Sequence, residues 1–293
     1  MKLHLRFWNI PLLFAVFALL QGCDKDDEKQ IPPPPMHIPE WELDFEDNFE
    51  GGSVDTEQWS IYNSAGHNSN GLRHPSAYTV EDGNLVVTAR MCAVSGNQAE
   101  IDGQKVAIAS GAKLSDDGTK VLVSGGMAHR KEYSPGTKFE FRVRCEKDAS
   151  NTMSAVVLTW PKSGSDRNAR CEESDIYETG STTGATRDKV SSFFHYGLHP
   201  DKNNGKITQK QKDYPIDATE WHTMGFEWYT DKVYVFLDGV KVWTILDKEI
   251  VPIYDHHLCI QLDAFGTQLS ETNPTVKMYV DWVRIYVDKN PEE

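Results

Sequence analysis

The chain has 293 residues, of which 39% are hydrophobic and 25% charged, a mix typical of a globular protein that buries a core. Its formal net charge of −14 argues against nucleic acid as a partner, and against strongly anionic polymers such as heavily sulfated glycans. The length allows one large β domain or two small ones.

The N-terminus is predicted to be a targeting segment rather than part of the fold. Lys2 and Arg6 precede an apolar run, residues 7–20, that is too short for a comfortable membrane span. The Leu-Leu-Gln-Gly-Cys sequence ending at Cys23 resembles the bacterial lipoprotein box, which predicts cleavage before this cysteine and lipidation of its thiol. A plain secretory peptide is the alternative. We expect residues 1–22 to be a lipoprotein signal peptide and the mature protein to be lipid-anchored in the bacterial cell envelope, at the outer membrane, facing the periplasm or the outside.

The rest of the chain is predicted to be a short tether followed by a β domain. Residues 23–40 are acidic and proline-rich, which is typical of an extended spacer. From Trp41 onward the sequence reads as short strands separated by turns, without sustained helical periodicity. Two segments, Tyr78–Arg90 and Val233–Trp243, alternate on either side of an Asp-Gly dipeptide and predict β-hairpins. We expect one β domain over residues 41–290.

The cysteines leave two alternatives open. An exported protein could pair them as disulfides, and buried free thiols in strands are an equal alternative. No C-x-x-C spacing occurs, so a zinc site is not expected. Besides Cys23, the cysteines are Cys92, Cys145, Cys171 and Cys259.

Two consecutive segments have the patterns of strands on the two sides of a core. Lys138–Arg144 alternates charged and apolar residues, as a half-buried antiparallel strand does. Arg142 and Arg144 share one face of it and are candidates to meet the carboxylates of a site; solvated arginines are the alternative. Met153–Trp160 is a nearly continuous apolar run, as expected of a strand in a sandwich core.

The segment Cys171–Gly180 carries the clearest chemical signal. It holds four carboxylates within seven residues, Glu172–Glu178. Crowded carboxylates repel one another and lose hydration on burial, so a fold rarely gathers them for stability alone. Hydrolysis of a glycosidic bond needs such a group, because one carboxylate attacks the sugar while another donates a proton.

Strand geometry predicts which of these carboxylates share a face. Side chains alternate along a strand, so Glu173 and Asp175 point the same way. Glu178 has the opposite parity in a regular strand. A single β-bulge near Ile176 or Tyr177 would turn it back to the same face. The pattern therefore predicts a bulged strand with three carboxylates on one side.

The sequence from Glu173 to Glu178, Glu-Ser-Asp-Ile-Tyr-Glu, resembles the E-x-D-x-x-E signature of glycoside hydrolase family 16, the laminarinase, agarase and carrageenase group. The resemblance implies an all-β fold, an antiparallel β-sandwich jelly roll of the concanavalin A-like kind with a concave substrate cleft. It implies Glu173 as the nucleophile, Asp175 as its hydrogen-bonding assistant and Glu178 as the acid and base. Ser174 departs from the family, which has Ile, Leu or Val there, and a buried serine hydroxyl needs a partner.

The same resemblance assigns residues to the binding of a sugar. Trp160 is a candidate stacking platform, because an aromatic face suits the C–H face of a sugar; a core tryptophan is the alternative. His195 is expected to reach a sugar hydroxyl or Glu178, and a structural histidine is the alternative. The remaining candidates for substrate binding are Arg142 and Tyr177.

Other segments resemble the framework strands of the family. Leu43–Gly51 resembles its first strand, Ser124–Cys145 the strand preceding the catalytic one, and Phe193–Gly197 the strand facing the catalytic one. Residues 276–287 resemble its closing strand, in which Asp281 is a candidate ligand of a structural calcium ion.

Together these inferences predict a retaining endo-glycosidase. It would hydrolyse a β-linked polysaccharide, a β-1,3-glucan, mixed-linkage glucan or galactan, by double displacement and without a cofactor for catalysis. The expected partners are the polysaccharide and, through the lipid anchor, a membrane, and we expect a monomer. The alternative is a surface lipoprotein that binds glycans on the same fold with weak or no catalysis. A polysaccharide lyase is less favoured, because the carboxylates would repel a uronate.

Overall fold

The computed structural model describes residues 38–161, 170–181, 186–199 and 205–291. The predicted signal peptide, the lipidation at Cys23 and most of the tether lie outside the described residues. Within the described part the chain is almost entirely antiparallel β-strand, and it contains no helix that is long and apolar enough to cross a membrane.

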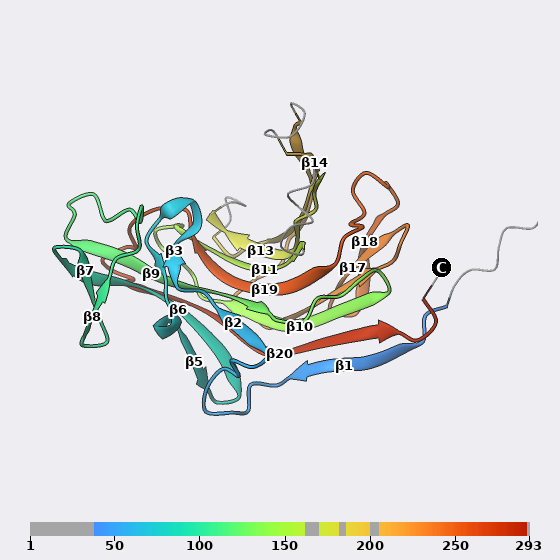
Figure 1. Ribbon diagram of the computed structural model, residues 1–293, viewed down its shortest axis with the longest axis horizontal. Helices are drawn as coiled ribbons and strands as arrows, with labels where there is room; N and C mark the ends of the chain where they lie inside the picture. Colours follow the sequence, from blue (N-terminus) through green and yellow to red (C-terminus); the bar gives the residue numbers. More distant parts are fainter. Residues whose placement is uncertain (1–37, 162–169, 182–185, 200–204, 292–293) are drawn as a thin grey trace, which may run out of the picture. The chain divides into compact units, whose positions relative to one another are not determined.

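One of the two main sheets carries the acidic segment, and we call it the cleft sheet (Figure 1). Its strands are antiparallel to their neighbours, and β12 (Arg170–Cys171) pairs with the C-terminal end of β14 (Val190–Leu198). In spatial order the strands are β2 (Trp59–Ile61), β9 (Lys120–His129), β19 (His256–Ala264), β11 (Met153–Pro161), β13 (Ser174–Gly180), β14 (Val190–Leu198) and β15 (Ile207–Tyr214).

The second sheet, the back sheet, is built around β20 (Thr275–Asp288). Strands β1 (Trp41–Asp47) and β6 (Asn84–Ser95) pair with one edge of β20, and β10 pairs with the other. From that edge the order is β10 (Thr137–Cys145), β16 (His222–Trp228), β17 (Val233–Leu237) and β18 (Val240–Ile245).

The sheets are joined by one shared strand and extended by short elements. The first part of β9 pairs with β6, and its second part pairs with β19, so that this strand passes from the back sheet to the cleft sheet. The shorter elements are β3 (Ser64–Ala65), β4 (Leu72–Arg73), β5 (Tyr78–Glu81), β7 (Gln98–Ile101), β8 (Gln104–Ala107) and the 3-10 turns η1 (His67–Ser69) and η2 (Pro75–Ala77).

The hydrophobic core lies between the two sheets. Phe139 of β10 and Phe226 of β16 are fully buried, with ring centroids 6.1 Å apart. Phe226 also lies 6.0 Å from Phe194 of β14, so the aromatic contacts run from the back sheet into the cleft sheet. Burial of these rings contributes strongly to stability, because each removes a large apolar area from water. The predicted antiparallel jelly-roll sandwich is confirmed.

Both predicted hairpins are present. Asp82 and Gly83 join β5 to β6 with φ of 51° and 71°, and Asp238 and Gly239 join β17 to β18 with φ of 49° and 76°. Two consecutive residues with positive φ give a type I′ turn, whose twist matches that of the flanking strands.

The placement of β10 corrects one prediction. The strand belongs to the back sheet, and Arg142 points away from the core on the outer face. There its guanidinium forms an ion pair with Asp281 (2.5 Å) and stacks over Trp221 at 5.0 Å. The prediction that Arg142 binds substrate is therefore wrong. Asp281 has this arginine as its partner, and no group of three or more His, Cys, Asp or Glu side chains in the described ranges is arranged to hold a metal.

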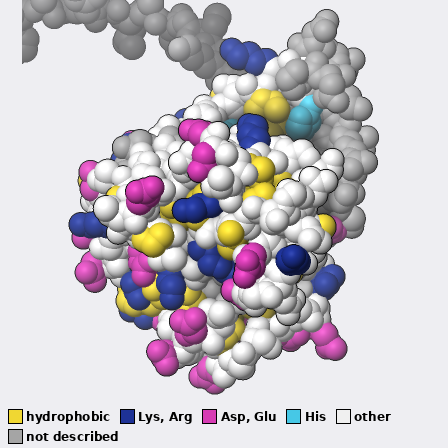
Figure 2. Space-filling model, turned by 90° about the vertical axis from the view of Figure 1, so that its left-hand side faces the viewer, with side chains coloured by type: hydrophobic (Ala, Val, Ile, Leu, Met, Phe, Trp, Pro, Cys, Tyr) yellow, Lys and Arg dark blue, Asp and Glu magenta, His cyan; other side chains and the backbone are white. Residues whose placement is uncertain are grey.

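The surface charge is mixed in sign where it can be seen. Figure 2 shows the side of the molecule at the left of Figure 1, and there acidic and basic side chains are interspersed. The negative net charge is thus not gathered into one patch on this face.

Candidate active site

The second part of the acidic segment forms β13, Glu173 directly precedes this strand, and the strand contains the predicted bulge. On one side Val157 pairs with Tyr177 while Leu158 pairs with Asp175, so Ile176 is the extra residue. The register with β14 shifts over the same stretch. The bulge restores the parity of Glu178, which lines the same cleft as Asp175.

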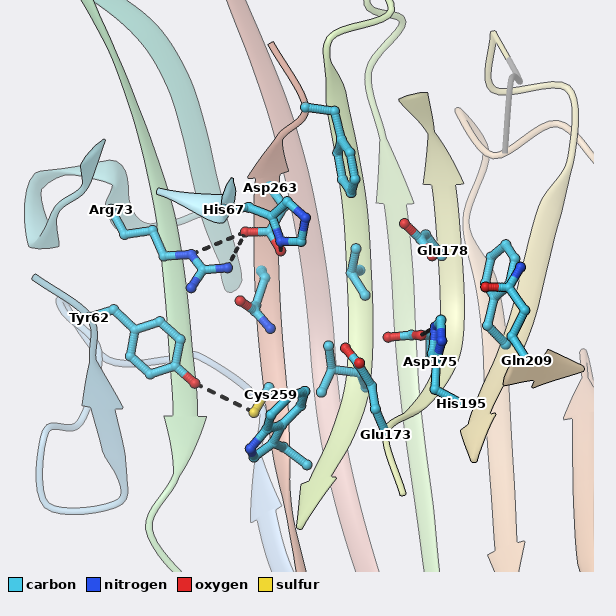
Figure 3. A pocket seen from close by; sticks show the side chains of 16 residues that line it. Tyr62, His67, Arg73, Glu173, Asp175, Glu178, His195, Gln209, Cys259 and Asp263 are labelled. Atoms are coloured by element: carbon cyan, nitrogen blue, oxygen red, sulfur yellow. Dashed lines mark hydrogen bonds and ion pairs between the residues drawn. The ribbon is translucent and has the colours of Figure 1, made fainter. Parts of the chain in front are cut away.

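The three candidate catalytic carboxylates lie together in a cleft on the outer face of the cleft sheet. The cleft has a volume of about 700 Å³. Glu173, Asp175 and Glu178 all line it, and their side chains point into it (Figure 3). Asp175 and Glu178 are 4% and 7% exposed, so two carboxyl groups are almost fully removed from water at the floor of an open site.

Two residues of the motif face the other way. Tyr177 is fully buried in the core between the sheets, so the prediction that it binds substrate is wrong. The bulge is the reason, because it places the side chains of both Ile176 and Tyr177 in the core. The next side chain, that of Glu178, again points into the cleft. Ser174 is buried as predicted, and its hydroxyl finds a partner by donating to the carbonyl oxygen of Glu172 at 3.4 Å.

The predicted sugar-binding residues Trp160 and His195 do line the cleft. Trp160, at the end of β11, is 38% exposed and is not a core residue. His195 of β14 places Nε2 3.2 Å from Oδ2 of Asp175, so it contacts this carboxyl rather than Glu178. Its backbone N–H also donates to the carbonyl oxygen of Glu173 at 2.9 Å, which ties the start of the acidic segment to β14.

Glu178 is oriented by a hydroxyl from the adjacent strand. Ser154 of β11 donates from Oγ to Oε1 of Glu178 at 2.9 Å. Both side chains are buried. A hydrogen bond of this kind fixes the carboxyl relative to the cleft and limits its rotamers.

Burial and mutual repulsion raise the pKa values of the site. The pKa of Glu173 is raised to about 8, first by loss of hydration and then by the charge of Asp175. The pKa of Asp175 is raised well above its usual range by burial, and then by the charges of Glu178 and Asp263. At neutral pH the cluster therefore retains protons.

Because the pKa of Glu173 is raised, we predict that replacing this residue increases the stability of the fold by an amount that depends on pH. In the folded state this group titrates near pH 8, against about 4.5 for an ordinary glutamate. Between these values the folded state binds the extra proton, so the wild type loses stability as pH rises through this window, and the loss levels off above pH 8. We expect Glu173→Gln to be more stable by about 1–3 kcal/mol at pH 8, roughly 2–10 °C in Tm, and nearly equal at pH 4.5.

Calorimetry of both proteins at pH 4.5, 6 and 8 checks this expectation. Glu57→Gln, at an exposed position, is a matched control that should follow the wild type throughout. A constant difference in Tm across the three pH values would contradict the assigned origin of the effect.

A buried network anchors the residue that precedes Glu173. Oε2 of Glu172 accepts the backbone N–H groups of Ile253 and Tyr254, both at 3.0 Å. Nε of Arg170 lies 3.1 Å from Oε1 of Glu172. These contacts fix the start of the acidic segment to the loop between β18 and β19, so Glu172 is a structural carboxylate and not part of the cleft.

The far wall of the cleft was not foreseen from the sequence. Arg73 of β4 donates to Oδ1 of Asp263 on β19, with the shorter contact at 2.6 Å, and the two residues are 190 positions apart. His67 stacks on Phe265 with ring centroids 4.4 Å apart. For Asp263 the only local signal is the alternation along 256–264. The other lining residues without a prediction are Tyr62, Val156, Leu158, Phe193, Gln209, Cys259 and Gln261.

The cysteines of the described residues are free thiols. All four described cysteines are buried and unpaired with one another, which agrees with the second of the two alternatives. Cys171 precedes the acidic segment, but it does not line the cleft.

Comparison with known proteins relates this fold to glycan-degrading enzymes. No protein-family model matches the chain. A glucan endo-1,3-beta-glucosidase of Cryptopygus antarcticus is 28% identical over 242 residues, 79% of this chain and 73% of that protein.

Solved structures share the fold at lower identity. The endo-beta-1,3-glucanase of Pyrococcus furiosus has a TM-score of 0.62 at 20% identity and covers 85% of this chain and 95% of its own. A structure from work on endo-acting O-glycanases of human gut microbiota that initiate mucin breakdown has a TM-score of 0.63 at 21% identity, covering 87% and 94%. Likeness at this level supports the fold alone, and these names span more than one class of glycan.

Proposed function

We propose that the chain is an endo-acting glycoside hydrolase of family 16 that cleaves a neutral β-1,3-linked glucan with retention of configuration. The observation that carries the proposal is the bulge of β13, through which Asp175 and Glu178 share one side of an open cleft with Glu173, the residue just before the strand. The Cryptopygus relative, an endo-1,3-glucosidase, supports the reaction class and the linkage.

The arrangement suits double displacement. In the first step ionised Glu173 attacks the anomeric carbon while the carboxyl of Glu178 gives its proton to the leaving oxygen, which forms a glycosyl ester and frees one end of the polymer. In the second step the carboxylate of Glu178 takes a proton from water, and the resulting hydroxide attacks the same carbon and releases Glu173.

Asp175 and His195 support the different roles of Glu173 and Glu178. Burial raises the pKa of Asp175 well above its usual range, so this carboxyl acts as a neutral hydrogen-bond donor rather than a third charge. His195 contacts Asp175 at 3.2 Å and keeps its carboxyl oriented.

The lining of the cleft favours a neutral polymer. Among the described lining residues Arg73 is the one arginine or lysine, and Asp263 neutralises it at 2.6 Å. The carboxylates of the site would repel sulfate and uronate groups. Trp160 provides an exposed aromatic surface for stacking against a sugar ring.

Release of reducing ends by residues 38–293 from a panel of neutral β-glucans and galactans tests the proposal. We expect release from β-1,3-glucan, with oligosaccharides rather than single sugars as early products. Retention is read from the anomer that forms first, by NMR. Binding to a polymer without any release would instead support the glycan-binding alternative, and release from galactan alone would overturn the proposed linkage class.

A further inference from the structure

A buried amide oxygen on the floor of the cleft has no hydrogen-bond partner within the described part of the chain. Gln261 of β19 lines the cleft and is 7% exposed, and its Oε1 has no partner among the described residues. Buried polar groups are nearly always paired, because an unmade hydrogen bond costs the full loss of hydration. A buried and unsatisfied amide in a ligand cleft therefore needs an explanation.

The sheet register places this amide in line with Glu178. Across the cleft sheet, Glu178 pairs with Val156, Val156 with Gln261, and Gln261 with Gly126. Neighbouring strands lie about 4.8 Å apart, so the backbones at Glu178 and Gln261 are separated by two strand spacings, about 10 Å. One bound glycan chain crossing the strands can contact both.

The neighbours of Gln261 cannot satisfy it. Val156 is apolar, and Gly126 has no side chain; a Cβ at Gly126 would come within 2.5 Å of the ring of Tyr62 and 3.1 Å of Cδ of Arg73. The side chains of Tyr62 and Arg73 cover Gly126 and form part of the far wall of the cleft. Arg73 is committed to Asp263 at 2.6 Å, and the hydroxyl of Tyr62 lies 3.5 Å from Sγ of Cys259.

We propose that Gln261 determines specificity by exchanging a hydrogen bond with a hydroxyl of the sugar unit bound on the β19 side of Glu178. The inference rests on the proposed function, since it assumes that a glycan occupies this cleft. A hydroxyl both donates and accepts, so either orientation of the amide satisfies it. A sugar unit that lacks this hydroxyl, or carries a charged group there beside Asp263, leaves the amide unpaired and is rejected.

Binding to the inactive variant Glu173→Gln tests the assignment without relying on turnover. By calorimetric titration with linear β-1,3-gluco-oligosaccharides of four to six units, we expect added Gln261→Leu to weaken Kd about tenfold or more. In the active protein the same substitution should lower kcat/KM by a similar factor. Gln98→Leu, at an exposed position on β7, is the matched control and should leave both unchanged.

A stability measurement separates a binding role from a structural one. Leucine is similar in size and removes an unsatisfied polar group, so Tm of Gln261→Leu should be equal to or above that of the parent. Loss of affinity together with a lowered Tm would overturn the inference, as would unchanged affinity. Absence of turnover in the wild type, with the tenfold difference in Kd intact, would overturn the proposed hydrolase while supporting this binding role.

Discussion

Glu173→Gln is expected to lower kcat on the polymer by about 10⁴-fold or more, the scale seen when an enzyme loses its nucleophile. The amide nitrogen and oxygen have nearly the shape of the carboxylate but cannot form the glycosyl ester. The substitution should not disturb the fold, because it removes a group whose pKa is raised to about 8 by burial and by the charge of Asp175. Reducing-end release, followed over hours at high enzyme concentration, measures the residual rate.

The matched control is again Glu57→Gln, which changes the same chemical group at an exposed position and should keep full activity. A further variant tests the covalent step. Glu173→Ala leaves space beside the anomeric carbon, and added azide should restore part of the turnover and yield a glycosyl azide of inverted configuration. Turnover of folded Glu173→Gln within tenfold of the wild type would show that another group attacks the sugar.

The bulge could be predicted from the sequence. The chemistry needs Glu178 on the same face as Asp175, whereas a regular strand would place it on the opposite face. Burial of the Glu178 carboxylate loses hydration free energy, and this loss has a function only if Glu178 shares the face of Asp175. An extra residue therefore had to lie between them. The same reasoning, carried one position further, places Tyr177 in the core. The bulge that turns Glu178 toward the cleft turns Tyr177 into the core, so Tyr177 cannot also line the cleft.

Arg142 shows a different limit. The alternation of Lys138–Arg144 correctly predicts one buried and one exposed face, but both sheets of a sandwich give this pattern. Which sheet a strand joins depends on pairing with distant strands, here β16 and β20. The far wall is harder still, because Arg73 and Asp263 meet only through the fold, and neither has a local motif.

Gln261 could not be found from sequence for a related reason. A glutamine in an alternating strand is ordinary, and its meaning depends on the absence of a partner. That absence follows from Gly126 and Val156 on the neighbouring strands, which are known only once the register is known.

Glu178→Gln is expected to lower turnover of the polymer by about 10²–10⁴-fold, the usual contribution of a positioned acid and base. The size of the loss should depend on the leaving group. A sugar alkoxide needs a proton to depart, whereas a dinitrophenolate leaves without one. On an aryl glycoside with that leaving group, we therefore expect the first step to remain fast while the second, which needs a base for water, becomes slow.

Rapid-quench kinetics distinguish this from a general loss of activity. The variant should release a burst of about one dinitrophenolate per active site and then turn over slowly, and azide should speed the slow phase because it attacks without a base. Ser154→Ala is the graded comparison, since it removes the 2.9 Å hydrogen bond that orients Glu178 but keeps the carboxyl. It should show a smaller loss and no burst. Equal losses on polymer and aryl glycoside in Glu178→Gln would mean that this residue holds the substrate in place, and the proton donor would then have to be sought among the other carboxyl groups of the cleft.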